Sequence, residues 1–325
     1  MTTAISLWIV YVGAVALYLR AAVNGIARGA NPWRYVAGAP LVYLAILGSI
    51  ALLWFALAWV FRSPRPKAMR IGLGATLRLF WDEMWAIAAS SRHMAMYRFL
   101  PGDPPPRKAR APVLLLHGVL CNAGSMHDLR KGLVARGIEP VYTLSYGPPL
   151  ASIDSFLDQV AAKIDAILAA TGARRVAIVG HSMGGLVARA YLRRHGAEKV
   201  GTVITLGTPH KGSVHAWLFP GVSLGQLRPA NAWLAELGRA PASKEVRIVS
   251  IWSWHDSMVA PQTSAELAGA QNIALAGIGH NALVSNERVY EIVATELKRV
   301  AEPVQVLHSA SATECDKSRG RFVGL

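Results

Sequence analysis

One serine in this sequence stands where serine can act as a nucleophile. Residues 180–185 read GHSMGG, which fits the pattern G-x-S-x-G centred on Ser182. The pattern is common by chance, but here an apolar stretch at 175–179 precedes it and a helix-forming stretch at 183–195 follows it. A strand, a sharp turn and a helix place the hydroxyl at a helix N-terminus, where developing negative charge is stabilised. We therefore predict a nucleophile rather than an incidental serine in a glycine-rich turn.

A serine hydroxyl is activated by a general base that an acid orients. Asp256 follows a predicted strand at residues 245–252, whereas the only other aspartate after Ser182, Asp316, lies in a tail without periodicity. Glu266 is the only nearby acidic substitute. We therefore predict Asp256 as the acid.

The base is expected to be a histidine near the end of the predicted domain. His280 follows a predicted strand at residues 272–276, lies in a glycine-containing loop and precedes a closing helix at 286–300. The other histidines downstream of the serine lie at a helix end, in an insertion, beside the acid or in the tail. We predict His280 as the base, so that the chain order is serine, aspartate, histidine. His181 and His210 are expected to line the pocket or to have structural roles.

A tetrahedral oxyanion needs hydrogen-bond donors, and these are usually backbone N–H groups beside the nucleophile. Residues 113–116 form an apolar stretch that runs into a turn at His117 and Gly118. We expect the backbone N–H groups of Val119 and Met183 to bind the oxyanion. His117 is expected to brace this loop beside the substrate rather than to transfer protons.

A long insertion separates the fourth predicted strand from the fifth. The segment at about 209–244 is too apolar for a solvated loop, and residues 230–237 fit a short amphipathic helix. One interpretation is a small subdomain packed on the core. The other is a lid over Ser182 whose apolar face, including Trp217 and Phe219, binds an acyl chain.

The elements that must position these residues alternate between short apolar runs and longer amphipathic ones. Apolar strands that alternate with helices are typical of a parallel sheet covered on both faces. We therefore predict an α/β fold with a mostly parallel central sheet and helices on both faces. Strands are expected at residues 112–116, 139–144, 175–179, 199–206, 245–252 and 272–276, and helices at 123–136, 152–170, 183–195 and 286–300.

The N-terminal part has a different pattern, with uncharged apolar runs at residues 4–19 and 36–61. The second run is long enough to cross a bilayer core of about 30 Å. Several tryptophans and tyrosines lie near the ends of the runs, as membrane-interface anchors do. A cleaved signal peptide is the alternative for the first run, but no cationic segment precedes it. We predict a membrane hairpin at 1–61, with one or two transmembrane helices.

A basic, proline-containing linker is predicted at residues 62–108. Within it, residues 71–100 mix apolar and basic side chains, which predicts an amphipathic helix that lies on the membrane surface or packs on the core. A proline-rich loop at 101–107 marks the boundary to a catalytic domain at 109–301. Residues 302–325 are expected to form a flexible tail.

The composition agrees with a membrane protein, since 53% of the residues are hydrophobic and 16% are charged. The net charge of +15 favours contact with anionic lipid over nucleic acid, because the basic residues show neither interleaved aromatics nor a nucleic-acid motif. A solvated arginine-rich surface is the alternative. Cys121 and Cys315 lie far apart and support neither a disulfide framework nor a zinc site.

The orientation of the hairpin follows from the basic residues beside its helices. By the positive-inside rule, a slight excess after the second run places the catalytic domain in the cytoplasm. The loop between the runs carries Arg20, Arg28 and Arg34, whereas the segment after them carries Arg62, Arg65, Lys67 and Arg70.

The motifs around the three predicted catalytic residues resemble those of bacterial lipases and esterases of the α/β-hydrolase superfamily. The HG pair at 117–118 is similar to their oxyanion loop, and LGTPHKGS at 206–213 is similar to the segment after their next strand. The resemblance covers residues 112–300, and the first hundred residues have no counterpart in the secreted lipases.

This resemblance implies hydrolysis of acyl or lipid esters through an acyl-enzyme, without a cofactor. Together with the apolar N-terminal runs, it predicts an enzyme anchored in a bacterial inner membrane. A thioesterase or acyltransferase uses the same residues, and a non-catalytic membrane-anchored binding protein is the alternative from another class. Calcium-binding relatives carry carboxylates near the base histidine, whereas residues 281–286 read NALVSN. We therefore expect no metal.

Overall fold

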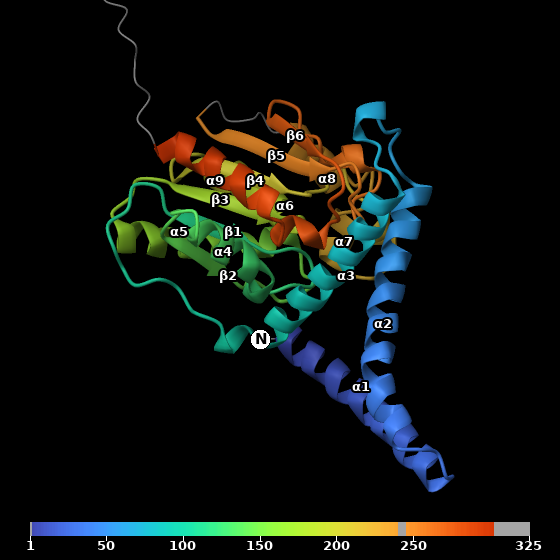
Figure 1. Cartoon of the computed structure of the whole chain (residues 1–325). Helices are drawn as coiled ribbons and strands as arrows, with labels where there is room; N and C mark the ends of the chain where they lie inside the picture. Colours follow the sequence, from blue (N-terminus) through green and yellow to red (C-terminus); the bar gives the residue numbers. More distant parts are fainter. Residues whose placement is uncertain (1, 240–244, 302–325) are drawn as a thin grey trace, which may run out of the picture.

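The computed structural model describes residues 2–239 and 245–301, so the predicted tail at 302–325 lies outside the described residues. Within those ranges a sheet of six strands has the order β2-β1-β3-β4-β5-β6, and every neighbouring pair is parallel (Figure 1). The predicted α/β architecture is confirmed. The strands are β1 (Val113–Leu116), β2 (Val141–Leu144), β3 (Val176–His181), β4 (Val200–Leu206), β5 (Arg247–Ser253) and β6 (Gln271–Leu275).

Both faces of the sheet are covered by helices, because alternate residues of a strand point to opposite faces. Leu114 and Leu116 of β1 pack with α5 and α6, whereas Val113 and Leu115 pack with α4 and α9. All four side chains are buried, which explains why the strand is apolar throughout rather than alternating. The four helices are α4 (His127–Val134), α5 (Leu157–Thr171), α6 (Met183–His195) and α9 (Glu287–Ala301).

The parallel topology decides where a site can form. The carboxyl ends of all six strands meet at one edge of the sheet, and the loops after β1, β3, β5 and β6 gather there. Open α/β sheets bind their ligands at this edge. The residues predicted to be catalytic all lie on these loops.

Two N-terminal helices, α1 (Thr2–Ala27) and α2 (Trp33–Val60), form a hairpin that projects away from the sheet (Figure 1). In the described part of the chain α2 is the one helix long and apolar enough to cross a membrane, with a mean hydropathy of 2.4 and 17% of that window buried. The shorter apolar stretch of α1 is Val12–Ala27. A signal sequence near the N-terminus passes the same test of length and composition, so a membrane hairpin stays a prediction.

The predicted amphipathic helix is α3 (Leu73–Ala95), which lies between the hairpin and the sheet (Figure 1). Met84 and Ala88 pack on α2, and other residues of α3 contact the short helices η3 (Ala123–Met126) and η7 (Asn281–Val284). The helix therefore packs on the core, which is one of the two predicted alternatives. It also exposes an apolar stripe at four-residue spacing, formed by Leu73, Leu77, Trp81 and Trp85.

Candidate active site

The turn between β3 and α6 holds Ser182 in a conformation that residues with side chains rarely adopt. Ser182 has φ 54° and ψ −123°, and α6 begins at the next residue. A Cβ on Gly180 would overlap the backbone of Gly184, and a Cβ on Gly184 would overlap that of Leu116. The sharp turn therefore requires both glycines, and it places the serine at the amino end of α6.

The predicted acid and base lie together on loops from neighbouring strands. Asp256 follows β5, His280 follows β6, and His280 Nδ1 lies 2.9 Å from Asp256 Oδ2. Both side chains are buried. The other carboxylate oxygen accepts the backbone N–H groups of Met258 and Val259, at 2.8 and 2.7 Å. The carboxylate is thus held in place, and its bond to Nδ1 leaves Nε2 as the ring nitrogen that can take a proton.

Opposing effects set the pKa of His280. Burial lowers it, but the charge of Asp256 and its hydrogen bond raise it, and the charge of Glu83 raises it further. The net result is a pKa above the ordinary histidine value, so the ring is a stronger base than an ordinary histidine side chain. Glu83 belongs to α3 and was not among the residues expected from the sequence.

The nucleophile segment adjoins this pair through His181. The rings of His181 and His280 have centroids 4.7 Å apart, and His181 Nε2 donates to the backbone oxygen of His280 at 3.1 Å. Among the described residues the Ser182 hydroxyl has no hydrogen bond to the His280 ring, a contact that often forms only when substrate binds. The structure brings Ser182, Asp256 and His280 to one edge of the sheet, and their catalytic roles remain predictions.

Two further histidines have structural surroundings. Burial and the charge of His280 lower the pKa of His181 to about 3, so this ring stays neutral and supports the base loop. His210 is buried between Arg189 and Thr205, each 3.2 Å from one of its ring nitrogens. Of the two roles expected for these histidines, the contacts favour the structural one.

The loop after β1 lies directly beside the nucleophile. A Cβ on Gly118 would lie 3.1 Å from Ser182 Cβ and 3.5 Å from Ser182 Oγ. Within the described ranges the N–H groups of Val119 and Met183 have no hydrogen-bond acceptor. Unpaired N–H groups beside a nucleophile are what an oxyanion hole requires, so the geometry supports the predicted donors.

His117 has both ring nitrogens engaged within the protein. Its Nδ1 donates to the backbone oxygen of Gly118 at 2.8 Å, its Nε2 lies 3.4 Å from the N–H of Tyr146, and its ring stacks on that tyrosine at 4.0 Å. Burial lowers the pKa of His117 to about 4, so the ring is neutral at physiological pH. These contacts favour the bracing role, while contact with substrate stays a prediction.

The predicted lid contains η5 (Val214–Trp217), α7 (Val222–Gln226) and α8 (Ala232–Arg239), and residues 240–244 lie outside the described part. Leu224 and Leu237 are buried in the core beside α6, as the subdomain interpretation requires. Trp217 and Phe219 are exposed instead, by 62% and 45%. The ring centroids of Phe219 and of Trp54 in α2 lie 6.1 Å apart, so the segment contacts α2.

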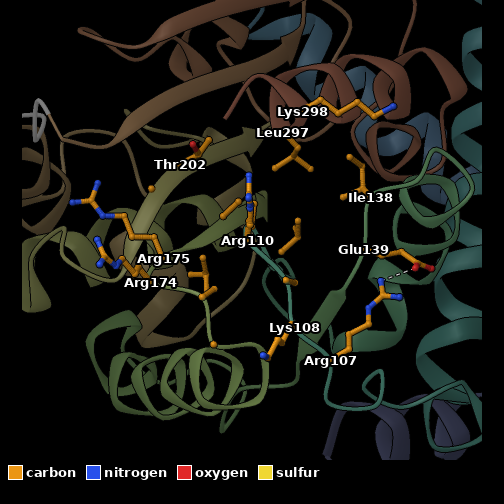
Figure 2. A pocket seen from close by; sticks show the side chains of 18 of the residues that line it. Arg107, Lys108, Arg110, Ile138, Glu139, Arg174, Arg175, Thr202, Leu297 and Lys298 are labelled. Carbon is orange, nitrogen blue, oxygen red and sulfur yellow. Dashed lines mark hydrogen bonds and ion pairs between the residues drawn. The ribbon is translucent and has the colours of Figure 1, made fainter. Parts of the chain in front are cut away.

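A large hollow of about 1170 Å³ lies at the opposite edge of the sheet (Figure 2). It is lined by the first residues of the strands, including Val113, Val176 and Thr202, and so lies far from the loops that carry the predicted catalytic residues. This hollow is therefore distinct from the candidate active site. Its cationic lining consists of Arg107, Lys108, Arg110, Arg174, Arg175 and Lys298.

One group of described side chains has a composition suited to a metal ion: the ligand atoms of His93, His127 and Asp128 lie within 4.8 Å of one another. The guanidinium of Arg92 donates to His93 Nε2 at 3.2 Å, which leaves the Nδ1–H to face Asp128 Oδ2 at 3.5 Å. His93 is therefore satisfied by protein partners. The expectation of no metal stays a prediction.

Comparisons with known proteins agree with this fold. The model of the PGAP1-like alpha/beta domain matches residues 135–274. The chain is 29% identical over 151 residues to a triacylglycerol lipase of Vibrio cholerae, covering 45% of each protein. It is 28% identical over 225 residues to a GPI inositol-deacylase of Candida albicans, covering 58% of this chain and 52% of the relative. The chain thus spans about half the length of these relatives.

Solved structures of lipases share the fold at low identity. The mature lipase BlEst2 of Bacillus licheniformis has a TM-score of 0.54 at 19% identity, covering 60% of this chain and 96% of that one. Lipase B of Aspergillus fumigatus has a TM-score of 0.57 at 18% identity, covering 79% and 86%. These similarities concern the fold alone.

Proposed function

We propose that this chain is a lipase/esterase-like α/β-hydrolase that cleaves carboxylic esters with Ser182 as the nucleophile. The observation that carries the proposal is the buried hydrogen bond between His280 and Asp256 on loops beside the strained serine turn. A paired histidine and carboxylate near a serine hydroxyl at a helix N-terminus serve acyl transfer better than other chemistry.

The reaction would proceed in two steps. Ser182 Oγ attacks the ester carbonyl while its proton passes to His280 Nε2, and Asp256 stabilises the imidazolium that forms. The oxyanion would accept hydrogen bonds from the N–H groups of Val119 and Met183. Collapse breaks the ester C–O bond, and the alcohol leaves with the proton from His280. A water molecule, activated by the same histidine, then releases the acyl group as a carboxylic acid.

A lipid ester is the substrate class that the surroundings of the site favour. The relatives are named as a triacylglycerol lipase and a GPI inositol-deacylase. A mostly apolar cavity of about 350 Å³ between α2 and α3 reaches the acid loop, since its lining includes Leu52, Phe55 and Phe80 as well as Asp256. Apolar residues of α2 therefore approach the site itself. We propose a membrane-anchored enzyme of the bacterial inner membrane, with its catalytic domain in the cytoplasm.

Labelling with a fluorophosphonate, followed by a panel of p-nitrophenyl esters, tests this proposal. The full chain in detergent is expected to be labelled and to hydrolyse the esters without an added acceptor. Ser182→Ala should lose both properties while its thermal unfolding temperature stays close to that of the wild type. A folded wild-type protein that is neither labelled nor active would instead support a non-catalytic binding protein, and an activity that needs an added acceptor would support an acyltransferase.

A further inference from the structure

A buried carboxylate outside the predicted triad joins the acid loop to the base loop. Glu83 of α3 is fully buried, and its Oε1 accepts the hydroxyl of Ser257 at 2.6 Å. The same oxygen accepts the backbone N–H and the side-chain amide of Asn281, at 3.0 and 2.9 Å. Oε2 accepts the N–H of Ala282 at 3.0 Å. One side chain from a helix almost two hundred residues earlier thus holds both loops.

The four donors flank the two residues whose alignment the reaction needs. Ser257 directly follows Asp256, and Asn281 directly follows His280. The hydroxyl of Ser257 also accepts the backbone N–H of His280 at 3.4 Å, so the two loops are linked to each other as well as to Glu83. A shift of this carboxylate would therefore move both catalytic side chains.

The space around the carboxylate is closely fitted. A Cβ on Gly279 would overlap the carboxylate of Glu83, so the loop before His280 approaches α3 as closely as a glycine permits. No cation forms an ion pair with Glu83 in the described part of the chain; its partners are hydroxyl, amide and backbone N–H donors. A buried carboxylate is costly to desolvate, and here four hydrogen bonds offset that cost.

We propose that Glu83 is a positioning residue that fixes the Asp256 and His280 loops relative to each other, which makes α3 part of the catalytic centre. The proposal rests on the proposed function, because it assumes that His280 is the base. It also goes beyond that function, because a helix outside the matched hydrolase region contributes to the site.

The pH dependence of turnover separates this role from simple stabilisation. The charged or titratable groups that face His280 are Asp256 from the acid loop, Glu83 from α3, His181 before the serine and His215 from η5. Burial lowers the pKa of His280, while Asp256 and Glu83 raise it. Removing the charge of Glu83 should therefore lower the pKa of His280 and move the acidic limb of kcat/KM to lower pH.

The test compares Glu83→Gln with Asp82→Asn in the full chain, using a p-nitrophenyl ester. Asp82 is the adjacent residue on α3 and is exposed, so it is a matched removal of charge. In Glu83→Gln the new side-chain NH₂ group would face a hydrogen-bond donor, because all four partners of the Glu83 carboxylate are donors. With rates normalised to sites titrated by fluorophosphonate, we expect kcat to fall on the order of 10- to 100-fold, KM to change little and the acidic limb to move to lower pH. Asp82→Asn should match the wild type.

A residue that only stabilises the fold would reduce the number of titrated sites and leave kcat per site and the acidic limb unchanged; that result would overturn the proposal. If Glu83→Gln does not fold, Ser257→Ala keeps the buried charge and removes one donor, and kcat per site should then fall several-fold. An unchanged kcat per site in that variant would equally overturn it. A wild-type protein without labelling or turnover would instead refute the proposed function, so the two failures are distinguishable.

Discussion

The loops that carry Asp256 and His280 differ sharply from the segment that carries Trp217 and Phe219. The loops contact α3 through Glu83, and the segment contacts α2 through Trp54. The loops with Asp256 and His280 are buried. Both carboxylate oxygens of Asp256 have hydrogen-bond partners, and the hydroxyl of Ser257 donates to Glu83. In the other segment Trp217 and Phe219 are exposed, and their contacts are with Arg228 and Trp54.

This difference assigns different tasks to the two regions. Proton transfer requires donors and acceptors to be aligned within fractions of an ångström, which a buried network provides. An acyl chain is bound by apolar area without directional contacts, so exposed aromatic side chains beside the predicted membrane helix would be sufficient. Substitutions in the catalytic loops should therefore cost orders of magnitude, and substitutions in the lid segment only small factors.

The largest effect within this comparison is expected for Asp256→Asn. An asparagine keeps the shape of the side chain but favours the wrong tautomer of His280, so kcat should fall by about 10⁴-fold, as in the serine-protease precedent. Stopped-flow or long-time ester hydrolysis would measure the loss, with Asp165→Asn on the outside of α5 as the control for a lost charge. Turnover within tenfold of the wild type would show that Asp256 is not the acid.

The pH dependence of the wild-type enzyme gives the next largest effect. His280 must be neutral to accept the serine proton, and its pKa lies above the ordinary histidine value. Below that pKa, kcat/KM should fall tenfold per pH unit, and the acidic limb should lie at a higher pH than the ordinary histidine pKa. An acidic limb near the pKa of a free carboxyl group would indicate that a different residue serves as the base.

Local patterns were sufficient to predict most of the fold and the placement of three site residues. The apolar runs at 175–179 and 199–206 became β3 and β4 with ends shifted by at most two residues, because buried parallel strands have no polar positions. Ser182 was recognised because its strand, turn and helix are contiguous in sequence. Asp256 and His280 can be predicted because each lies in the loop that follows a strand.

Glu83 could not be predicted in this way, because its role depends on contacts between residues about 174 and 198 positions apart. A signal did exist in the acidic pair at residues 82–83, which interrupts an otherwise apolar and basic helix. Nothing local distinguishes the exposed Asp82 from the buried Glu83. The helix predicted at 123–136 also differs in the structure, because its first turn is the 3-10 helix Ala123–Met126 and α4 begins after it.

The smallest effect concerns the lid segment and is the most direct test of the contrast. Burial of each added methylene contributes up to about 0.8 kcal/mol, which is roughly fourfold in kcat/KM, so specificity should rise with acyl length over several carbons. Trp217→Ala and Phe219→Ala should each flatten this rise and leave hydrolysis of acetate esters nearly unchanged. Phe99→Ala removes a more exposed aromatic ring outside the segment and should leave the rise intact.

The measurement is kcat/KM for p-nitrophenyl esters of increasing chain length, with each variant normalised to titrated sites. If lid residues act only through apolar contact, the slopes should differ between variants while the intercepts at acetate coincide. If acetyl esters are strictly preferred and neither substitution alters that preference, the segment does not bind acyl chains and the subdomain interpretation is correct. If acetate turnover falls together with the slope, the segment contributes to the alignment of the catalytic loops, and the division between the two regions is wrong.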